Sequence, residues 1–375
     1  MATLNLKNYF QLMTEYNASD LYITAGAPAA IKVNGLLRSI NSEVLTAPEA
    51  RDVILQTMSP TQQQTFLREL EMNLGIEEPG CGSFRVNVYQ QRGQLAMVVR
   101  RIPSKIPTME ELGLPEIFKK IIMARRGLIL ITGATGTGKS TTMASMIDYR
   151  NRNSGGHIIS VEDPIEFLHQ HHKSIISQRE IGIDTHSYEN ALQSIVREAP
   201  DLVYIGEIRS REVMLKAIQL AETGHLCISS LHANNSPQAI ERIINLFPND
   251  WHAQILSDLS LNLRAIISQR LVPALDGKRV ASFEIMTNSP RISDIIRTGD
   301  LHEIRDLLVR EDIEGIQSFD TDLYKLFKTG KISKEEALRN ASSEHNLSVK
   351  IALDKGADFS SEHKFSMDAI KKPKL

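Results

Sequence analysis

Residues 133–140 carry the clearest chemical signal in this sequence, because they can hold a chain of phosphates. They fit the pattern G-x-x-x-x-G-K-[ST] without a mismatch and follow a short, β-branched apolar run that predicts a buried strand. Glycines in such a loop let backbone N–H groups curl around a diphosphate. We expect Lys139 to reach the β- and γ-phosphates and the Ser140 hydroxyl to ligate Mg²⁺. The predicted nucleotide-binding residues are Gly133, Ala134, Thr135, Gly136, Thr137, Gly138, Lys139, Ser140 and Thr141.

Two acidic segments follow predicted strands and could serve nucleotide hydrolysis. Glu162-Asp163-Pro164-Ile165-Glu166 comes after the run His157–Val161, and Gly206-Glu207 comes after Leu202–Ile205. An α/β sheet gathers its site at the carboxyl ends of its strands, where one acid can orient water and another can support Mg²⁺. From spacing alone, the first segment could also be a solvated acidic turn, and Glu207 could be a surface carboxylate.

His225 and His232 flank the next predicted strand, Leu226–Ser229. An extended chain of this length separates them by roughly 20 Å, which argues against one metal site that uses both. A lone histidine is more often structural than a sensor of the γ-phosphate. Arg85 and Arg100 cannot be assigned from spacing, because arginines on a strand are by default solvated or paired with an acid.

Strands and helices alternate from Arg126 to Met286, a pattern typical of a mostly parallel sheet with helices on both faces. We expect one helix from Ser187 whose apolar face ends with Val196, and another with Ser236 at its N-cap. The predicted strands of this part are residues 126–132, 157–161, 202–205, 226–229 and 280–285.

The flanking regions have different patterns. The first hundred residues predict a small α+β domain, with a half-buried strand around Phe84. Two prolines in Pro103–Pro107 indicate a linker. Beyond Ser289 the apolar spacing is helical, and from Ser342 the polar, lysine-rich sequence predicts a loosely held tail. The predicted division is residues 1–102, a linker and helix at 103–125, an α/β core at 126–288, a helical region at 289–341 and the tail at 342–375.

Composition excludes several classes of protein. A formal net charge of −2 argues against a protein that coats nucleic acid. Cys81 and Cys227 are too far apart for a disulfide framework or a zinc site, so we expect two small buried residues in a reducing cytoplasm. No signal peptide and no run of 18 apolar residues is present, so we expect no direct membrane insertion.

Four segments resemble, in order, the motifs of the secretion ATPase superfamily. Residues 133–140, 161–166, 206–209 and 223–234 look like its Walker A, Asp box, atypical Walker B and His box. The resemblance extends from Ala18-Ser19-Asp20-Leu21 to Phe283-Glu284-Ile285 and covers nearly the whole chain. It is strongest with the retraction ATPases of type IV pili, the PilT/PilU family, and within that family with PilU-like members.

This resemblance implies a RecA-like P-loop NTPase core, a PAS-like N-terminal α+β domain and C-terminal helices. It implies a homohexamer in the cytoplasm, peripheral at the inner membrane, that hydrolyses ATP with Mg²⁺ and powers or assists pilus retraction in twitching motility. The implied partners are a PilT-like retraction ATPase and a PilC-like platform protein of the inner membrane.

The resemblance also implies roles for single residues. Glu166 corresponds to the catalytic glutamate that polarises water, and Glu207 to a group that supports Mg²⁺ through water. His232 and His225 match residues of the His box that sense the nucleotide. Arg85 and Arg100 match arginines of the N-terminal domain that reach the phosphates.

Two departures from the family pattern matter. Extension and secretion motors carry a four-cysteine zinc module, which two cysteines cannot supply, and this favours the retraction branch. Residues 293–300 replace a motif of PilT-like chains that is important for retraction, which favours a PilU-like accessory role. The alternatives are a pilus-assembly or type II secretion ATPase, a RecA-like nucleic-acid motor, and a scaffold that binds ATP without turnover. A small-molecule kinase lacks support, because no second substrate pocket is readable.

Overall fold

The computed structural model describes residues 5–103, 105–310 and 313–354. Its first domain is an antiparallel sheet in the order β3-β2-β1-β6-β5-β4, with helices packed on it. The elements are α1 (Leu6–Glu15), β1 (Asp20–Thr24), β2 (Ala30–Val33), β3 (Leu36–Ser39), α2 (Ala47–Leu55), α3 (Pro60–Glu69), β4 (Glu71–Glu78), β5 (Gly82–Gln91) and β6 (Gln94–Ile102).

Local signals explain much of this domain. Asn34 and Gly35 both have positive φ, as the tight turn between β2 and β3 requires. Thr46 and Ser59 close capping boxes at the starts of α2 and α3. Phe84 alternates with polar neighbours along β5 and stacks on α1 in the buried core. Strand β4 was not anticipated from the sequence.

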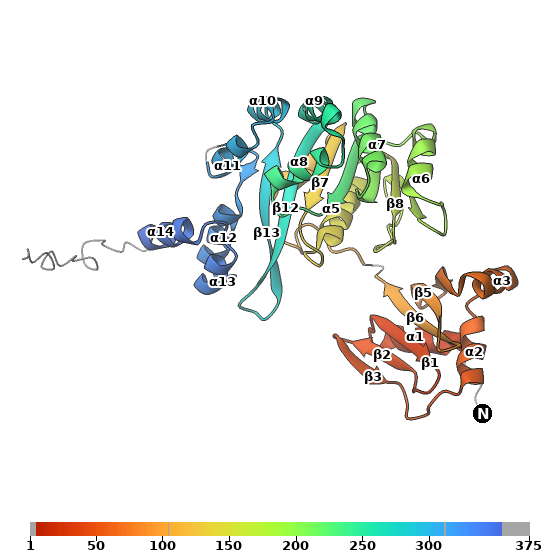
Figure 1. The fold of residues 1–375 in the computed structure, drawn as a ribbon. Coiled ribbons are helices and arrows are strands. Elements are labelled where there is room, and N and C mark those ends of the chain that lie inside the picture. The colour runs from red at the N-terminus through yellow and green to blue at the C-terminus, as the bar shows by residue number, and fades with distance from the viewer. Residues whose placement is uncertain (1–4, 104, 311–312, 355–375) are drawn as a thin grey trace, which may run out of the picture.

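The segment between the domains starts without regular structure. Thr108 and Glu111 exchange the two hydrogen bonds of a capping box, from each backbone N–H to the other side chain. The residues that follow form turns rather than a helix, and α4 (Ile117–Ile122) begins only later. Figure 1 shows the N-terminal domain below the larger sheet, joined to it by this segment.

The second domain is built on an eight-stranded sheet in the order β14-β13-β12-β7-β11-β10-β8-β9. The strands from β12 to β9 run parallel, and β13 and β14 are antiparallel additions. Its strands are β7 (Gly127–Thr132), β8 (Gly156–Glu162), β9 (Ser174–Glu180), β10 (Leu202–Glu207), β11 (Leu226–Leu231), β12 (Leu263–Pro273), β13 (Arg279–Thr287) and β14 (Ile316–Gln317).

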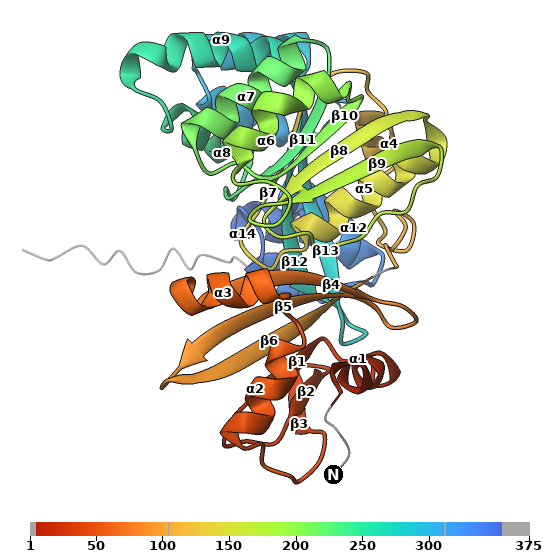
Figure 2. The ribbon, with the colours of Figure 1, turned by 90° about the vertical axis from the view of Figure 1, so that its right-hand side faces the viewer.

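Helices cover both faces of this sheet, as Figure 2 shows for α6, α7 and α8 on one side and α4 and α5 on the other. Alternate residues of β7 therefore enter two apolar cores, with Leu128 and Leu130 in one and Ile129 and Ile131 in the other. The helices are α5 (Lys139–Asn153), α6 (Tyr188–Ile195), α7 (Arg211–Glu222), α8 (Ser236–Ile244), α9 (His252–Asn262) and α10 (Pro290–Thr298).

Several local predictions for this domain need correction. Val196 does not extend the buried face of α6, because it lies in a 3₁₀ turn and is 52% exposed. Asn235 rather than Ser236 caps α8, since the Asn235 side chain accepts the Gln238 N–H. Strands β9 and β12 and helix α9 were not anticipated from the sequence.

The last three helices of the described residues pack on the long hairpin formed by β12 and β13, whereas the helix before them packs on the core of the large sheet. The prediction of a loose tail from Ser342 is wrong for its first part, because α14 buries Leu347 and Ile351 in this cluster. The rest of the predicted tail, residues 355–375, lies outside the described residues. The elements are α11 (His302–Leu308), α12 (Phe319–Lys328), α13 (Lys334–Arg339) and α14 (Glu344–Asp354).

Cys81 and Cys227 are both buried and unpaired by disulfide, as the sequence predicts. Burial raises the pKa of the Cys227 thiol to about 12, so this side chain packs as a small apolar group. Among the helices of the described residues, none is long and apolar enough to span a membrane.

Candidate nucleotide site

The loop after β7 turns tightly into α5, which begins at Lys139. Gly133 approaches β12 closely: a Cβ there would fall 2.5 Å from the backbone oxygen of Gln269. Gly138 has a φ of +86° at the N-cap of α5, a conformation that favours glycine. The loop therefore points the helix N-terminus and its backbone N–H groups toward one place, which is the geometry of a phosphate site.

Lys139 is folded over this loop. Its Nζ donates hydrogen bonds to the backbone oxygens of Gly133 at 2.9 Å and Ala134 at 3.0 Å. Partial burial lowers the pKa of Lys139, while the nearby carboxylates of Glu207 and Glu166 favour its charged form. The ammonium therefore stands where phosphate oxygens can replace the loop carbonyls as its partners.

A cavity of about 510 Å³ opens beside the loop. It lies at the carboxyl ends of β7, β8, β10 and β11, the edge at which an α/β sheet binds its ligands. Its lining includes residues of the loop together with Asp163, Glu166, Tyr188, Glu207, Arg209, His232 and Arg279. The fold thus brings three of the predicted catalytic residues, Glu166, Glu207 and His232, to one place.

Glu166 lies directly against the phosphate loop. The Ser140 hydroxyl donates a hydrogen bond to Glu166 Oε1 at 2.9 Å, and the glutamate is otherwise exposed to the cavity. Glu162, the other glutamate of this segment, points inward and accepts hydrogen bonds from Ser160 and Gln178. Burial raises the pKa of Glu162 to about 7. Of the two glutamates, only Glu166 faces the cavity.

Glu207 ends β10 as part of an ion cluster. Its carboxylate is 2.7 Å from Arg209 Nη2 and 3.0 Å from His232 Nε2. Gly206 permits this arrangement, because a Cβ there would fall 2.9 Å from the Tyr188 hydroxyl. Both Glu207 oxygens therefore already have cationic or hydrogen-bonding partners, which suits a group that acts on a metal through water.

His225 does not join this site. It precedes β11, and its backbone oxygen accepts the N–H of Gly127 at the start of β7, the edge opposite the phosphate loop. Its ring contacts Thr223 and the backbone of Leu220. Within one chain, the two histidines of the predicted His box lie at opposite ends of β11.

Arg85 and Arg100 face each other across β5 and β6, away from the cavity lining. Arg100 Nε is 2.8 Å from the buried carboxylate of Asp20. Arg85 Nε is 3.9 Å from Glu180 Oε1 at the end of β9. The structure therefore pairs both arginines with acids and brings neither to the phosphate loop.

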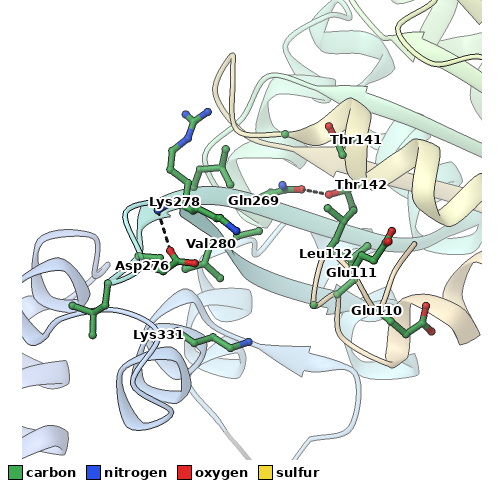
Figure 3. Close-up of a pocket in the computed structure, with 18 of the residues that line it drawn as sticks. Glu110, Glu111, Leu112, Thr141, Thr142, Gln269, Asp276, Lys278, Val280 and Lys331 are labelled. Carbon is green, nitrogen blue, oxygen red and sulfur yellow. Dashed lines mark hydrogen bonds between the residues drawn. The ribbon is translucent and has the colours of Figure 1, made fainter. Parts of the chain in front are cut away.

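Sequence reasoning missed the contribution of the β12–β13 hairpin. Gln269 on β12 accepts a hydrogen bond from the Thr142 hydroxyl at 2.8 Å (Figure 3). Its Nε2 donates to the backbone oxygen of Thr137 at 2.7 Å. Arg279 on β13 lines the cavity. The apolar run Ala265-Ile266-Ile267 could have indicated β12, but no local pattern marks either polar residue.

The oxygen donors of the cavity fit Mg²⁺, a cation that prefers hydroxyl, carboxylate and phosphate oxygens. Ser140 and Glu166 place two such groups 2.9 Å apart, and Glu207 lines the same space. A phosphate loop on a mostly parallel sheet, with acids at the ends of neighbouring strands, defines a RecA-like P-loop NTPase.

Comparison with known proteins agrees with this class. The family of Type II/IV secretion system proteins matches residues 3–328, so the chain belongs to that family. It is 48% identical to the type IV pilus ATPase PilU of Pseudomonas aeruginosa, over 97% of this chain and 95% of that protein. It is 38% identical to PilT of the same organism, over 92% of this chain and all of that one. The crystal structure of the pilus retraction motor PilT with bound ADP has a TM-score of 0.86 at 37% identity, covering 92% and 99% of the two chains.

Proposed function

We propose that this protein is an ATP-hydrolysing motor that powers or assists type IV pilus retraction in the manner of PilU. The observation that carries the proposal is the cavity in which the phosphate loop, Glu166, Glu207 and His232 meet. Support comes from relatives that span nearly the whole chain and are named pilus ATPases. The greater identity to PilU than to PilT favours the accessory role.

The nucleotide would occupy two neighbouring cavities. Its phosphates fit beside the loop, and its base and ribose fit a cavity of about 610 Å³ that shares Gly138, Thr141 and Leu271 with the first. Figure 3 shows this second cavity between Glu110–Leu112, the start of α5 and the β12–β13 hairpin. Its mixed lining suits a flat base held between apolar groups with a polar rim.

The positions of these groups support the following hydrolysis step. Lys139 exchanges the two loop carbonyls for phosphate oxygens. Glu166 orients a water molecule and accepts its proton as the water oxygen attacks the γ-phosphorus and the bond to the bridging oxygen breaks. His232, fixed by Glu207, stands at the same edge to sense the γ-phosphate.

The Ser140 hydroxyl, with Glu207 acting through water, would hold Mg²⁺, which supplies positive charge against the β- and γ-phosphates. Glu207 would keep its contacts to Arg209 and His232 in this arrangement, because a water molecule bridges the remaining distance.

The remaining parts of the motor are assigned by family resemblance. Arg85 and Arg100 would reach the phosphates when the N-terminal domain closes or when a neighbouring subunit presents them. A homohexamer, peripheral at the inner membrane, would act with a PilT-like ATPase on a PilC-like platform protein. Cycles of domain closure, with Pro103–Pro107 as the hinge, would be passed around the ring.

The first test is ATP turnover with Mg²⁺ for wild type and Glu166→Gln, together with mass by light scattering. We expect wild-type turnover at a six-subunit mass and a loss of about 10²-fold or more in the variant, the scale of a general base. Unchanged turnover in Glu166→Gln would move the base elsewhere. Stimulation of turnover by nucleic acid would favour a nucleic-acid motor, and nucleotide binding without turnover would favour a scaffold.

A further inference from the structure

Two side chains of β9 hold the loop that carries Glu166. Gln178 and Glu180 are two residues apart on the strand and therefore project to the same side. Gln178 Nε2 donates to the backbone oxygen of Phe167 at 2.9 Å, and the Ile165 N–H donates to Glu180 Oε2 at 3.0 Å. These bonds lie on either side of Glu166, so they fix the backbone from which its carboxylate projects.

Glu180 also meets the N-terminal domain. It is 6% exposed, and its second oxygen lies 3.9 Å from Arg85 Nε on β5. The neighbouring strand β4 approaches the same place, because a Cβ on Gly75 would fall 3.9 Å from Ile183 Cδ1. Burial raises the pKa of Glu180, while the Ile165 N–H and the charge of Arg85 favour its ionised form.

We propose that Glu180 is a positioning residue that holds the Glu166 loop with one oxygen and retains Arg85 with the other until nucleotide competes for that arginine. The proposal rests on two parts of the proposed function, ATP hydrolysis in the cavity beside the phosphate loop and the movement of Arg85 to the phosphates. Arg85 cannot serve a buried carboxylate and a phosphate at once. Its transfer from Glu180 to the nucleotide therefore links the position of the N-terminal domain to the strand that holds the catalytic loop.

The two oxygens can be tested separately. In Glu180→Gln the amide oxygen still accepts the Ile165 N–H, but the charge that holds Arg85 is gone. Glu180→Ala removes both contacts. A matched control is Glu198→Gln, which breaks the 3.2 Å ion pair between Glu198 and Arg179, the residue of β9 that projects to the other side.

Turnover should separate the variants. For Glu180→Ala we expect kcat to fall by about 10- to 100-fold, because small displacements of a catalytic group have effects of this size. For Glu180→Gln we expect kcat to stay near wild type. We expect KM for ATP to fall by about two- to fivefold, because Arg85 no longer has to leave an ion pair whose free energy corresponds to a factor of this size. Adding Arg85→Ala to Glu180→Gln should remove the change in KM, and Glu198→Gln should change neither constant.

Hydrogen exchange gives a readout that does not depend on turnover. Peptides covering residues 163–167 should lose protection in Glu180→Ala and keep it in Glu180→Gln. Wild-type kcat and protection in Glu180→Ala would overturn the positioning role, and an unchanged KM in Glu180→Gln would overturn the retention of Arg85. If the proposed ATP hydrolysis itself fails, the wild type, which carries an intact Glu180, shows no turnover. If only the Glu180 proposal fails, turnover is present in the wild type and lost in Glu166→Gln.

Discussion

Gln269 ties the phosphate loop to the sheet, and its loss should weaken both the fold and nucleotide binding. The side chain is 2% exposed and pairs with the Thr137 carbonyl and the Thr142 hydroxyl. Gln269→Leu keeps a similar volume but leaves these two groups without their partner. At about 1–3 kcal/mol for each buried group left unpaired, the variant should lose about 2–4 kcal/mol of unfolding free energy, because leucine also buries apolar surface.

A double-mutant cycle in urea unfolding, followed by circular dichroism, can test this account. Thr142→Val alone leaves Gln269 Oε1 unpaired and should cost about 1–2 kcal/mol. The double variant leaves only the Thr137 carbonyl unpaired, so its cost should be smaller than the sum by about 1 kcal/mol or more. Additive costs would refute the reasoning. Gln254→Leu, which removes an exposed hydrogen bond to Asp258, is the control and should cost less than about 0.5 kcal/mol. ADP affinity should fall in Gln269→Leu and stay unchanged in the control.

Three further predictions concern the buried acid Glu162 and the two arginines. Burial raises the pKa of Glu162 from 4.5 to about 7, so the folded state binds more protons than the unfolded chain in this window and stability falls as pH rises through it. Between pH 5 and pH 8, the free energy of unfolding in urea should therefore rise by about 2–3 kcal/mol in Glu162→Gln relative to wild type. An identical pH dependence in the two proteins would contradict this. Arg85→Ala should lower kcat by about 10³-fold with little change in nucleotide affinity, as for an arginine finger. Equal loss of affinity and rate in Arg85→Ala would make that arginine a binding residue only. Arg100→Ala should in addition lower the unfolding midpoint of the N-terminal domain, because it removes the partner of the buried Asp20, and an unchanged midpoint would contradict this.

The parts of the fold that could be predicted are those with a strong local pattern. The run before Gly133 is apolar on both faces because β7 is covered by helices on both sides. Strand β9 could not be predicted in the same way, because it is an edge strand whose last residues, Ser177–Glu180, are polar. Gln178 and Glu180 contact the Glu166 loop and Arg85, and Ser177 and Arg179 contact His157 and Glu198. These contacts are set by tertiary structure.

The candidate site likewise contains some residues that a local sequence pattern indicates and others that it does not. Motif spacing is sufficient to place Lys139, Ser140 and Glu207 at the carboxyl edge of the sheet, because each lies shortly after or at the end of one predicted strand. It could not find Gln269 or Arg279, which come from an antiparallel hairpin far along the chain and have no sequence pattern of their own. Spacing also indicated that His225 lies far from His232, since a residue before a strand and one after it lie at opposite edges of the sheet, and only the family resemblance assigned both to the site.

The two arginines of the N-terminal domain differ in how readily they can leave their present partners. Arg100 is 2.8 Å from Asp20, which is 3% exposed, so its departure would leave a buried carboxylate with only the Ser19 hydroxyl as a side-chain donor at 2.8 Å. Removing the cation from this buried carboxylate is unfavourable, and solvent around the 68% exposed Arg100 side chain reduces the cost without removing it. Arg85 is 3.9 Å from Glu180, too far for a hydrogen bond, and Glu180 keeps the Ile165 N–H when Arg85 leaves. A γ-phosphate can therefore capture Arg85 at a smaller cost than Arg100, so we expect Arg85 to be the first of the two arginines to respond to ATP.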